Sequence, residues 1–355
     1  MSAVRLSGGR VTAMRGVLAR TTLARSLAWA VLAAVLLVVV SDFISAYNDL
    51  QLATGAYYFA ALAGLTVLAG QSGQISLGHG ALMAVGAYTV ALLIGDEGWA
   101  LLPAIVAAVA VSVIVGIPVG AAASRLRGPY LAGATLAFAV GLPALADKFS
   151  GLLGGENGLT INPPIPPTWL GADFPLERWE AWIAGAGAVV VLFVLYNVIA
   201  SGAGRSFRAV RDDEIAASLC GLSVGRTQTT AFILSAGCAG LGGALLAVVL
   251  QLAQPGAFPL QLSLSLLTGV VLGGLGSLVG AVWGAALLTL LPNWTTDLAH
   301  SFSLSTKVSA NLPLAIYGIV LIVAMIVWPS GIQGGLRAIF GRLRSGRRAA
   351  ARGSA

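Results

Sequence analysis

Apolar runs of membrane-spanning length recur along almost all of this 355-residue chain. A helix needs about 20 predominantly apolar residues to cross the hydrocarbon core of a bilayer. The runs that approach this length are Leu27–Ile44, Leu52–Ala69, Leu77–Ile94, Ala100–Ala123, Tyr130–Leu145, Ala181–Ala200, Thr229–Leu250 and Leu312–Trp328. Only 9% of the residues are charged, against roughly 25% in soluble domains. We therefore expect an all-α polytopic membrane protein.

The charged residues separate according to the gaps between these runs. Most of the basic ones lie before the first run, after the fourth, after the sixth and after the last: Arg5, Arg10, Arg15, Arg20, Arg25, Arg125, Arg127, Arg205, Arg208, Arg211, Arg226, Arg337, Arg342, Arg344, Arg347, Arg348 and Arg352. The intervening gaps hold most of the acids: Asp42, Asp49, Asp96, Glu97, Asp147, Glu156, Asp173, Glu177, Glu180 and Asp297. Because positive loops stay cytoplasmic, both termini are predicted to be cytoplasmic. Basic cytoplasmic loops also account for the pI near 9.9, so no nucleic-acid partner is expected.

The stretch Leu262–Leu291 is too long for one span and short for two. The charge pattern requires it to cross an even number of times, either as two short spans or as a re-entrant hairpin turning at Gly273–Ser277. This gives about ten membrane segments. A cleaved signal is the alternative for the first run, but losing that span would upset the sidedness of every later charge. We predict a basic cytoplasmic extension (1–26), a transmembrane domain (27–336) and a basic cytoplasmic tail (337–355).

A glycine-rich polar strip without charge, Gly70–Gly80, lies between two of these runs. Backbone groups freed by glycine are tolerated at membrane depth only when they are buried in protein or face a water-filled cavity. The strip therefore predicts an inner gate, or a packing element beside a pathway, near the cytoplasmic face. Its candidate residues are Gln71, Ser72, Gln74, Ser76 and His79. For His79 a structural hydrogen-bonding role is favoured over a proton carrier.

The run Tyr130–Leu145 contains Gly133, Thr135, Gly141 and Pro143. Such a short, interrupted span is typical of the discontinuous helices that line substrate paths. The alternative is that its glycines permit close helix packing.

The segment 201–228 is a solvated island in an apolar chain. Residues 204–222 predict one helix ended by Gly221, with Phe207, Val210 and Ala217 on one face and Glu214 on the same side. Arg208 and Asp212 can pair at i, i+4. The helix could insert into a groove of a cytoplasmic partner, or lie on anionic lipid.

The external loop 147–180 contains Pro163-Pro164-Ile165-Pro166-Pro167, which predicts a stiff polyproline-II arm. Trp169, Trp179 and Trp182 are placed like headgroup-level anchors. The loop either docks an external partner or is a surface lid. Cys220 and Cys238 are interpreted as small apolar fillers. The chain has no phosphate-binding loop and no row of intramembrane carboxylates, so energy for any pumping must come from a partner.

Gly73-Gln74-Ile75-Ser76-Leu77-Gly78-His79-Gly80-Ala81, followed by Gly86-Ala87-Tyr88, resembles the signature of permeases in branched-chain amino acid ABC importers. Further blocks follow in the order of that family's M-type subunit: Arg127-Gly128-Pro129-Tyr130, Thr135-Leu136-Ala137-Phe138, Gly154-Gly155 with Gly158-Leu159, Gly204-Arg205 through Gly221, Val270 through Ser277, and Pro329-Ser330-Gly331-Ile332. The resemblance covers about Leu52 to Leu336.

The resemblance implies a type II-like ABC importer permease with pseudo-symmetric halves in the inner (plasma) membrane. Its implied partners are an H-type permease, two cytoplasmic ATPases that use ATP and Mg, and an external binding protein that delivers the solute. This chain itself would bind no cofactor or metal and catalyse nothing. Branched-chain or related amino acids are the expected solutes; urea, short amides or small carboxylates are the alternative. A stand-alone channel or ion-coupled carrier, or a membrane scaffold, are the competing classes.

The resemblance also assigns residues to roles. ATPase coupling is expected of Arg205, Phe207, Arg208, Val210, Arg211, Asp212, Glu214, Ala217 and Gly221. Thr135 and Phe138 join Gln71, Ser72, Gln74, Ser76 and His79 as candidates for the pathway or its gate. Glu156, Asn157, Asp173 and Glu177 are candidates for docking the binding protein.

Overall fold

The computed structural model describes residues 7–126, 129–171, 174–301, 315–316, 318–319, 322–323, 326 and 331–336. Seven helices in this part of the chain are long and apolar enough to cross a membrane, and His79–Gly95 and Leu278–Trp294 are shorter apolar helices. The expected all-α polytopic membrane architecture is confirmed. Asp173, the predicted span Leu312–Trp328 in most of its length, and the basic tail lie outside the described residues.

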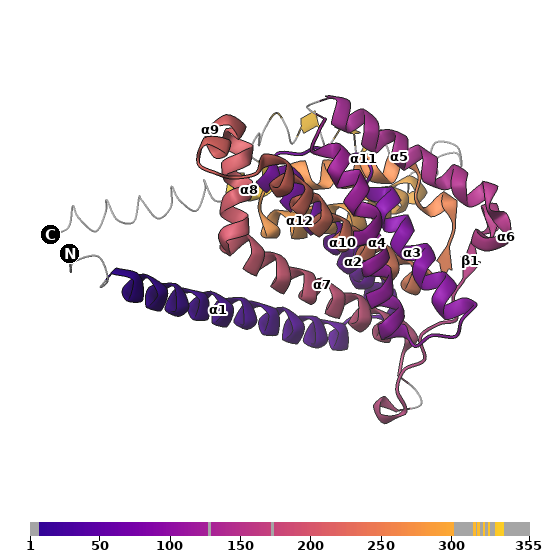
Figure 1. Ribbon diagram of the computed structural model, residues 1–355. Helices are drawn as coiled ribbons and strands as arrows, with labels where there is room; N and C mark the ends of the chain where they lie inside the picture. Colours follow the sequence, from indigo (N-terminus) through magenta and orange to yellow (C-terminus); the bar gives the residue numbers. More distant parts are fainter. Residues whose placement is uncertain are drawn as a thin grey trace, which may run out of the picture.

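The long helices form one bundle and alternate in direction along the chain (Figure 1). They are α1 Ser7–Phe43, α2 Ala46–Leu65, α3 His79–Gly95, α4 Leu101–Ala123, α5 Pro129–Lys148, α7 Leu176–Ala200, α10 Val224–Leu250, α11 Leu260–Gly273 and α12 Leu278–Ser301. Helix α1 runs from the basic extension into the first apolar run without a break.

Two groups of short elements lie at opposite ends of the bundle. At one end, which we call the α8 end, lie α8 Gly202–Asp212, α9 Glu214–Leu219 and the π-helical turn η1 Thr66–Gln71. At the other, the hairpin end, β1 Leu159–Thr160 pairs antiparallel with β2 Leu252–Ala253, with Leu159 opposite Ala253. The hairpin end also holds α6 Ser150–Leu153, η2 Gly155–Asn157 and η4 Pro255–Ala257, and η3 Thr168–Leu170 belongs to the arm that leaves it.

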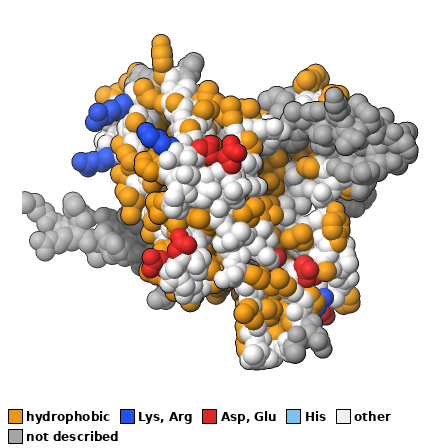
Figure 2. Space-filling model, turned by 90° about the vertical axis from the view of Figure 1, so that its right-hand side faces the viewer, with side chains coloured by type: hydrophobic (Ala, Val, Ile, Leu, Met, Phe, Trp, Pro, Cys, Tyr) orange, Lys and Arg blue, Asp and Glu red, His pale blue; other side chains and the backbone are white. Residues whose placement is uncertain are grey.

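Charged side chains divide between these ends. Arg125, Arg205, Arg208, Arg211 and Arg226 come from segments at the α8 end, whereas segments at the hairpin end supply Asp42, Asp49, Asp96, Glu97, Asp147, Glu156, Glu177 and Glu180. Hydrophobic side chains spread over the visible face of the bundle, and charged ones form only small groups (Figure 2). The helices thus sort the charges as the sequence pattern predicts.

Helix α10 is the centre of the bundle and packs against α2, α3 and α4. Its approach to α3 depends on glycine, because a Cβ on Gly243 would collide with the Met83 carbonyl, and one on Gly86 with the Gly240 carbonyl. Lipid chains are as apolar as leucine side chains, so helices in membranes associate through such close packing of small residues. The glycines of α3 and α10 therefore set the spacing of the core.

Two sequence-based alternatives are answered by the helices. Helix α5 is continuous through Pro143, so it is not a discontinuous helix. Among the described residues a Cβ on Gly133 or Gly141 would meet nothing within 4 Å, so neither glycine serves close packing against another described helix of this chain. The stretch after β2 forms α11 and α12, joined by a turn at residues 274–277. Helix α11 runs from the hairpin end to the α8 end, and Gly331 lies against Gly274, which favours two crossings over a re-entrant hairpin.

Helix α1 is bonded to α7 near both ends of their contact. Ser26 donates to the Asn197 Oδ1 at 3.1 Å, and the Trp182 indole donates to the Ser41 Oγ at 2.8 Å. Arg178 pairs with Asp42 at 3.1 Å. Such contacts are expected of a retained span, in line with the interpretation that we favour.

Replacing Gly243 with alanine is expected to destabilise the protein by about 1–3 kcal/mol, as overpacking of a tight core does. Gly133→Ala is the matched control: it lies in the open face of α5, and removing a helical glycine there is expected to stabilise by about 0.5–1 kcal/mol. Thermal unfolding of both variants in detergent measures the difference. Equal melting temperatures for the two would contradict the packing described.

Candidate functional site

The segment after α7 forms two helices rather than the single helix predicted. The backbone of Asp213 is extended (φ −158°, ψ 109°), which ends α8, and its carboxylate accepts from the amides of Ile215 and Ala216 to cap α9. An N-cap aspartate satisfies amides that have no helical partner, so it starts a new helix where the old one ends. Gly221 (φ +85°) follows α9, where the sequence predicts the stop.

These two helices bury one face and expose the other. Phe207 and Val210 of α8 and Ala217 of α9 are all buried, although they lie on two helices and not on one face of a single helix. Ile215 and Leu219 of α9 are 74% and 84% exposed, although both are large apolar residues. Cys238 is buried as predicted, but Cys220 is exposed at the end of α9, so its interpretation as an apolar filler is wrong. The polar island therefore presents an apolar spot outward.

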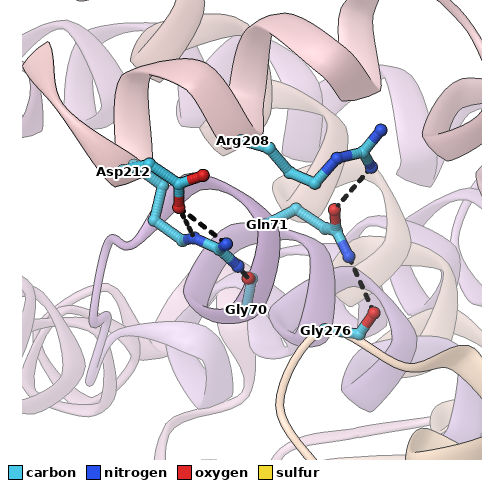
Figure 3. Close-up of polar contacts among 6 residues, drawn as sticks. Gly70, Gln71, Arg208, Asp212 and Gly276 are labelled. Atoms are coloured by element: carbon cyan, nitrogen blue, oxygen red, sulfur yellow. Dashed lines mark hydrogen bonds and ion pairs between the residues drawn. The ribbon is translucent and has the colours of Figure 1, made fainter.

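Two arginines of α8 bond to the start of the Gly70–Gly80 strip (Figure 3). Arg208 donates to the Gln71 Oε1 at 3.0 Å, and Arg211 donates to the Gly70 carbonyl at 2.6 Å. The predicted Arg208–Asp212 pair is wrong, because Asp212 pairs instead with Arg211 at 2.7 Å. Arg208 bonds to the buried Gln71 Oε1 of the strip and not to the carboxylate of Asp212, which is exposed to solvent.

The strip in turn contacts the 274–277 turn. Gln71 Nε2 donates to the Gly276 carbonyl at 2.7 Å, and a Cβ on Gly70 would collide with Gly276. The two glycine-rich turns, more than two hundred residues apart in sequence, thus touch directly beneath α8. Gly73 (φ +75°) packs against the Arg211 side chain from the other side.

A second row of polar contacts reaches the strip from α9. Glu214 accepts from the Gln228 side chain at 2.9 Å. The Gln228 carbonyl accepts from Gln74 Nε2 at 3.0 Å, and the same Nε2 donates to the Ser72 hydroxyl at 2.8 Å. Helix α8 is thus hydrogen-bonded directly to the strip, and α9 is linked to it through Gln228 of α10.

The end of the strip is bonded to three membrane helices. The Leu77 amide donates to the Thr135 hydroxyl of α5 at 3.0 Å, and the Gly80 amide donates to the Ser263 hydroxyl of α11 at 3.0 Å. His79 Nε2 lies 2.7 Å from the Ser235 hydroxyl of α10 and is fully buried. This bond fits the structural role favoured for His79. Ser235 and Ser263 were not predicted as site residues, because a lone serine in an apolar helix gives no sign of its partner.

The pathway candidates lie within this network. Gln71, Ser72, Gln74, Ser76, His79 and Thr135 are all buried. Thr135 and half-buried Phe138 also border a cavity of about 290 Å³ between α4 and α5, whose other lining residues are apolar. The strip residues chiefly contact protein in this conformation, so their part in transport stays a prediction.

At the hairpin end, Glu156 and Asn157 are exposed and Glu177 is half-buried. Sequence reasoning missed two buried carboxylates there: Asp49, 3.6 Å from the Arg178 Nε, and Glu180, which accepts from Gln251 at 3.0 Å. Each of these carboxylates has a partner far away in the sequence, so no local sequence pattern predicts that it is buried. Within the described ranges, no three His, Cys, Asp or Glu side chains are grouped to hold a metal ion.

Known relatives resemble this chain over most of its length. LivM, a high-affinity branched-chain amino acid transport system permease protein, is 32% identical over 295 residues in Salmonella typhimurium and 32% over 296 in Escherichia coli K12. Each alignment covers 76% of this chain and 66% of the relative, just under two thirds of its length. LivH of Escherichia coli K12 is 25% identical over 79% of this chain and 92% of its own. No solved structure matches the chain.

The family model described as branched-chain amino acid transport system / permease component matches residues 46–325, which hold every helix from α2 to α12 and the whole network around the strip. This is a family of transport permeases and not of enzymes. The chain belongs to it.

Proposed function

We propose that this chain is the M-type permease subunit of an ATP-driven importer for branched-chain or related amino acids. The observation that carries the proposal is the polar segment α8–α9, which exposes Ile215 and Leu219 outward and is bonded inward to the strip. A self-sufficient channel or carrier has no need of such a segment. The family match and the similarity to LivM and LivH support the same class.

The proposed orientation follows from the charges. The arginines of the α8 end favour a cytoplasmic position for that end, and the acid-rich hairpin end then faces outward. Both termini are cytoplasmic in this arrangement, and the membrane is the inner (plasma) membrane. Glu156, Asn157, Asp173 and Glu177 then belong to the face that receives the external binding protein.

ATPase coupling is assigned to α8 and α9. One of two cytoplasmic ATPases, which use ATP and Mg, receives the exposed apolar side chains of α9 in a groove, while Phe207 and Val210 hold α8 to the bundle. Exposed apolar spots rimmed by polar residues are typical of protein contacts. Arg205, exposed on α8, supplies a charge at the rim of this contact.

The second permease, of H type, completes the pathway. On the open face of α5 a Cβ at Gly133 or Gly141 would contact no described residue, and this face suits close packing of a second membrane helix or the passage of a solute. We place the gate at the strip and at Thr135 and Phe138. Solute affinity resides in the binding protein, so the strip need only open and close.

Uptake of labelled leucine into vesicles tests the proposed class. We expect uptake only when both permeases, the ATPases, ATP and the binding protein are present. Uptake by the permeases alone would point to a channel or ion-coupled carrier instead. Urea, a short amide and a small carboxylate, each tested with its own label, separate the alternative solutes.

Changing both Ile215 and Leu219 to aspartate is expected to lower ATPase binding and transport about tenfold or more, because charges replace buried apolar contacts at the interface. The control Ile215→Leu/Leu219→Met keeps the surface apolar and is expected to behave as wild type. Pull-down of the ATPases from detergent, together with uptake, measures both. If the aspartate variant still binds the ATPases but no longer binds lipid, the result would favour an interfacial helix that lies on lipid.

A further inference from the structure

We propose that Gln71 is the positioning residue that passes a displacement of α8 to both glycine-rich turns at once. The inference rests on the proposed function, since it takes α8 as the element that an ATPase moves. The Gln71 side chain contacts the two structures that must move together: Arg208 of α8 on one side and Gly276 of the 274–277 turn on the other.

The chemistry of the two partners, Arg208 and the Gly276 carbonyl, selects an amide at this position. A guanidinium only donates hydrogen bonds and a backbone carbonyl only accepts them. An amide placed between them accepts with its oxygen and donates with its nitrogen, at 3.0 Å and 2.7 Å here. Glutamate would keep the acceptor for Arg208 but present a second acceptor to Gly276, and leucine would keep the size and lose both bonds.

Burial makes this bridge strong and directional. Gln71 is only 7% exposed, so water does not replace its partners when α8 moves. Gly70 and Gly276 are in contact beside it, which fixes the distance that the bridge must span. Arg211 lies one turn after Arg208 on the same face of α8 and donates to the Gly70 carbonyl. Two neighbouring residues of the strip, Gly70 and Gln71, are therefore each bonded to one turn of α8.

The position of Gln71 in the chain explains why a displacement of its side chain would move several helices. It is the last residue of η1, the π-helical turn that ends α2. Single π-turns inside or at the end of helices are rare and occur often at functional sites. From Gln71 the strip continues to the bonds with α5, α10 and α11, whereas Gly276 leads directly into α12. The Gln71 side chain therefore connects α8 both to the strip, which is bonded to α5, α10 and α11, and to the turn that leads into α12.

The test uses the complete reconstituted transporter and measures solute transported per ATP hydrolysed. We expect Gln71→Leu and Gln71→Glu to lower this ratio roughly tenfold, the size expected from losing a buried hydrogen bond. Subunit assembly and ATP hydrolysis should remain. The control Gln51→Leu makes the same change at the opposite end of α2 and is expected to keep the wild-type ratio.

A double-mutant cycle with Arg208→Ala sharpens the result. If Gln71 acts in series with Arg208, the double variant Gln71→Leu/Arg208→Ala should be no worse than Arg208→Ala alone. A wild-type ratio in Gln71→Leu overturns the proposal, and so does a loss confined to yield or melting temperature, which would make Gln71 merely structural. Uptake by the wild-type permeases without ATPases is a separate result: it defeats the proposed function itself, whatever the Gln71 variants do.

Discussion

The fold depends on finding partners for the polar groups of an uncharged, glycine-rich strip, most of which is buried in the bundle. Lipid offers no partners to exposed backbone, so each freed amide or side chain must find one in the protein. Most polar groups of the strip find them in α8, α10, α11, α5 and the 274–277 turn, whereas Gln74 Oε1 and His79 Nδ1 have no hydrogen-bond partner among the described residues. Because these partners lie between Thr135 and Gly276 in the sequence, the strip links helices that are far apart along the chain. The same bonds make it the contact through which α8 reaches the membrane helices.

Packing around this centre is uneven. Helix α10 is almost enclosed, and its glycines let α3 approach to backbone contact. Helix α5 is attached to the strip through Thr135 but leaves cavities of about 290 and 350 Å³ on the sides facing α4 and α3. A tight core beside a loosely packed helix is the arrangement expected where one element must move and the rest must hold.

Apolar periodicity and charge placement predict the membrane class, nearly all the spans and the sides on which the loops lie, because the bilayer dictates length and sidedness locally. The break at Asp213 was missed because capping competes with helix continuation, and only tertiary contacts decide between them. The prediction of an Arg208–Asp212 pair failed for a related reason, because Arg208 bonds instead to Gln71, which is distant in sequence. Continuity of α5 through Pro143 shows that proline alone does not end a membrane helix, whose neighbours can satisfy the freed carbonyl.

The central claim is that α8, the strip and the 274–277 turn move as one body. Spin labels at Ala209 of α8 and Leu275 of the turn, both at exposed positions, report on it in the assembled transporter once Cys220 and Cys238 are replaced. A second pair, Ala209 and Leu152, spans the bundle from the α8 end to the hairpin end. The account predicts that ATP leaves the Ala209–Leu275 distance unchanged while the Ala209–Leu152 distance shifts. A change in the Ala209–Leu275 distance on ATP binding would contradict it.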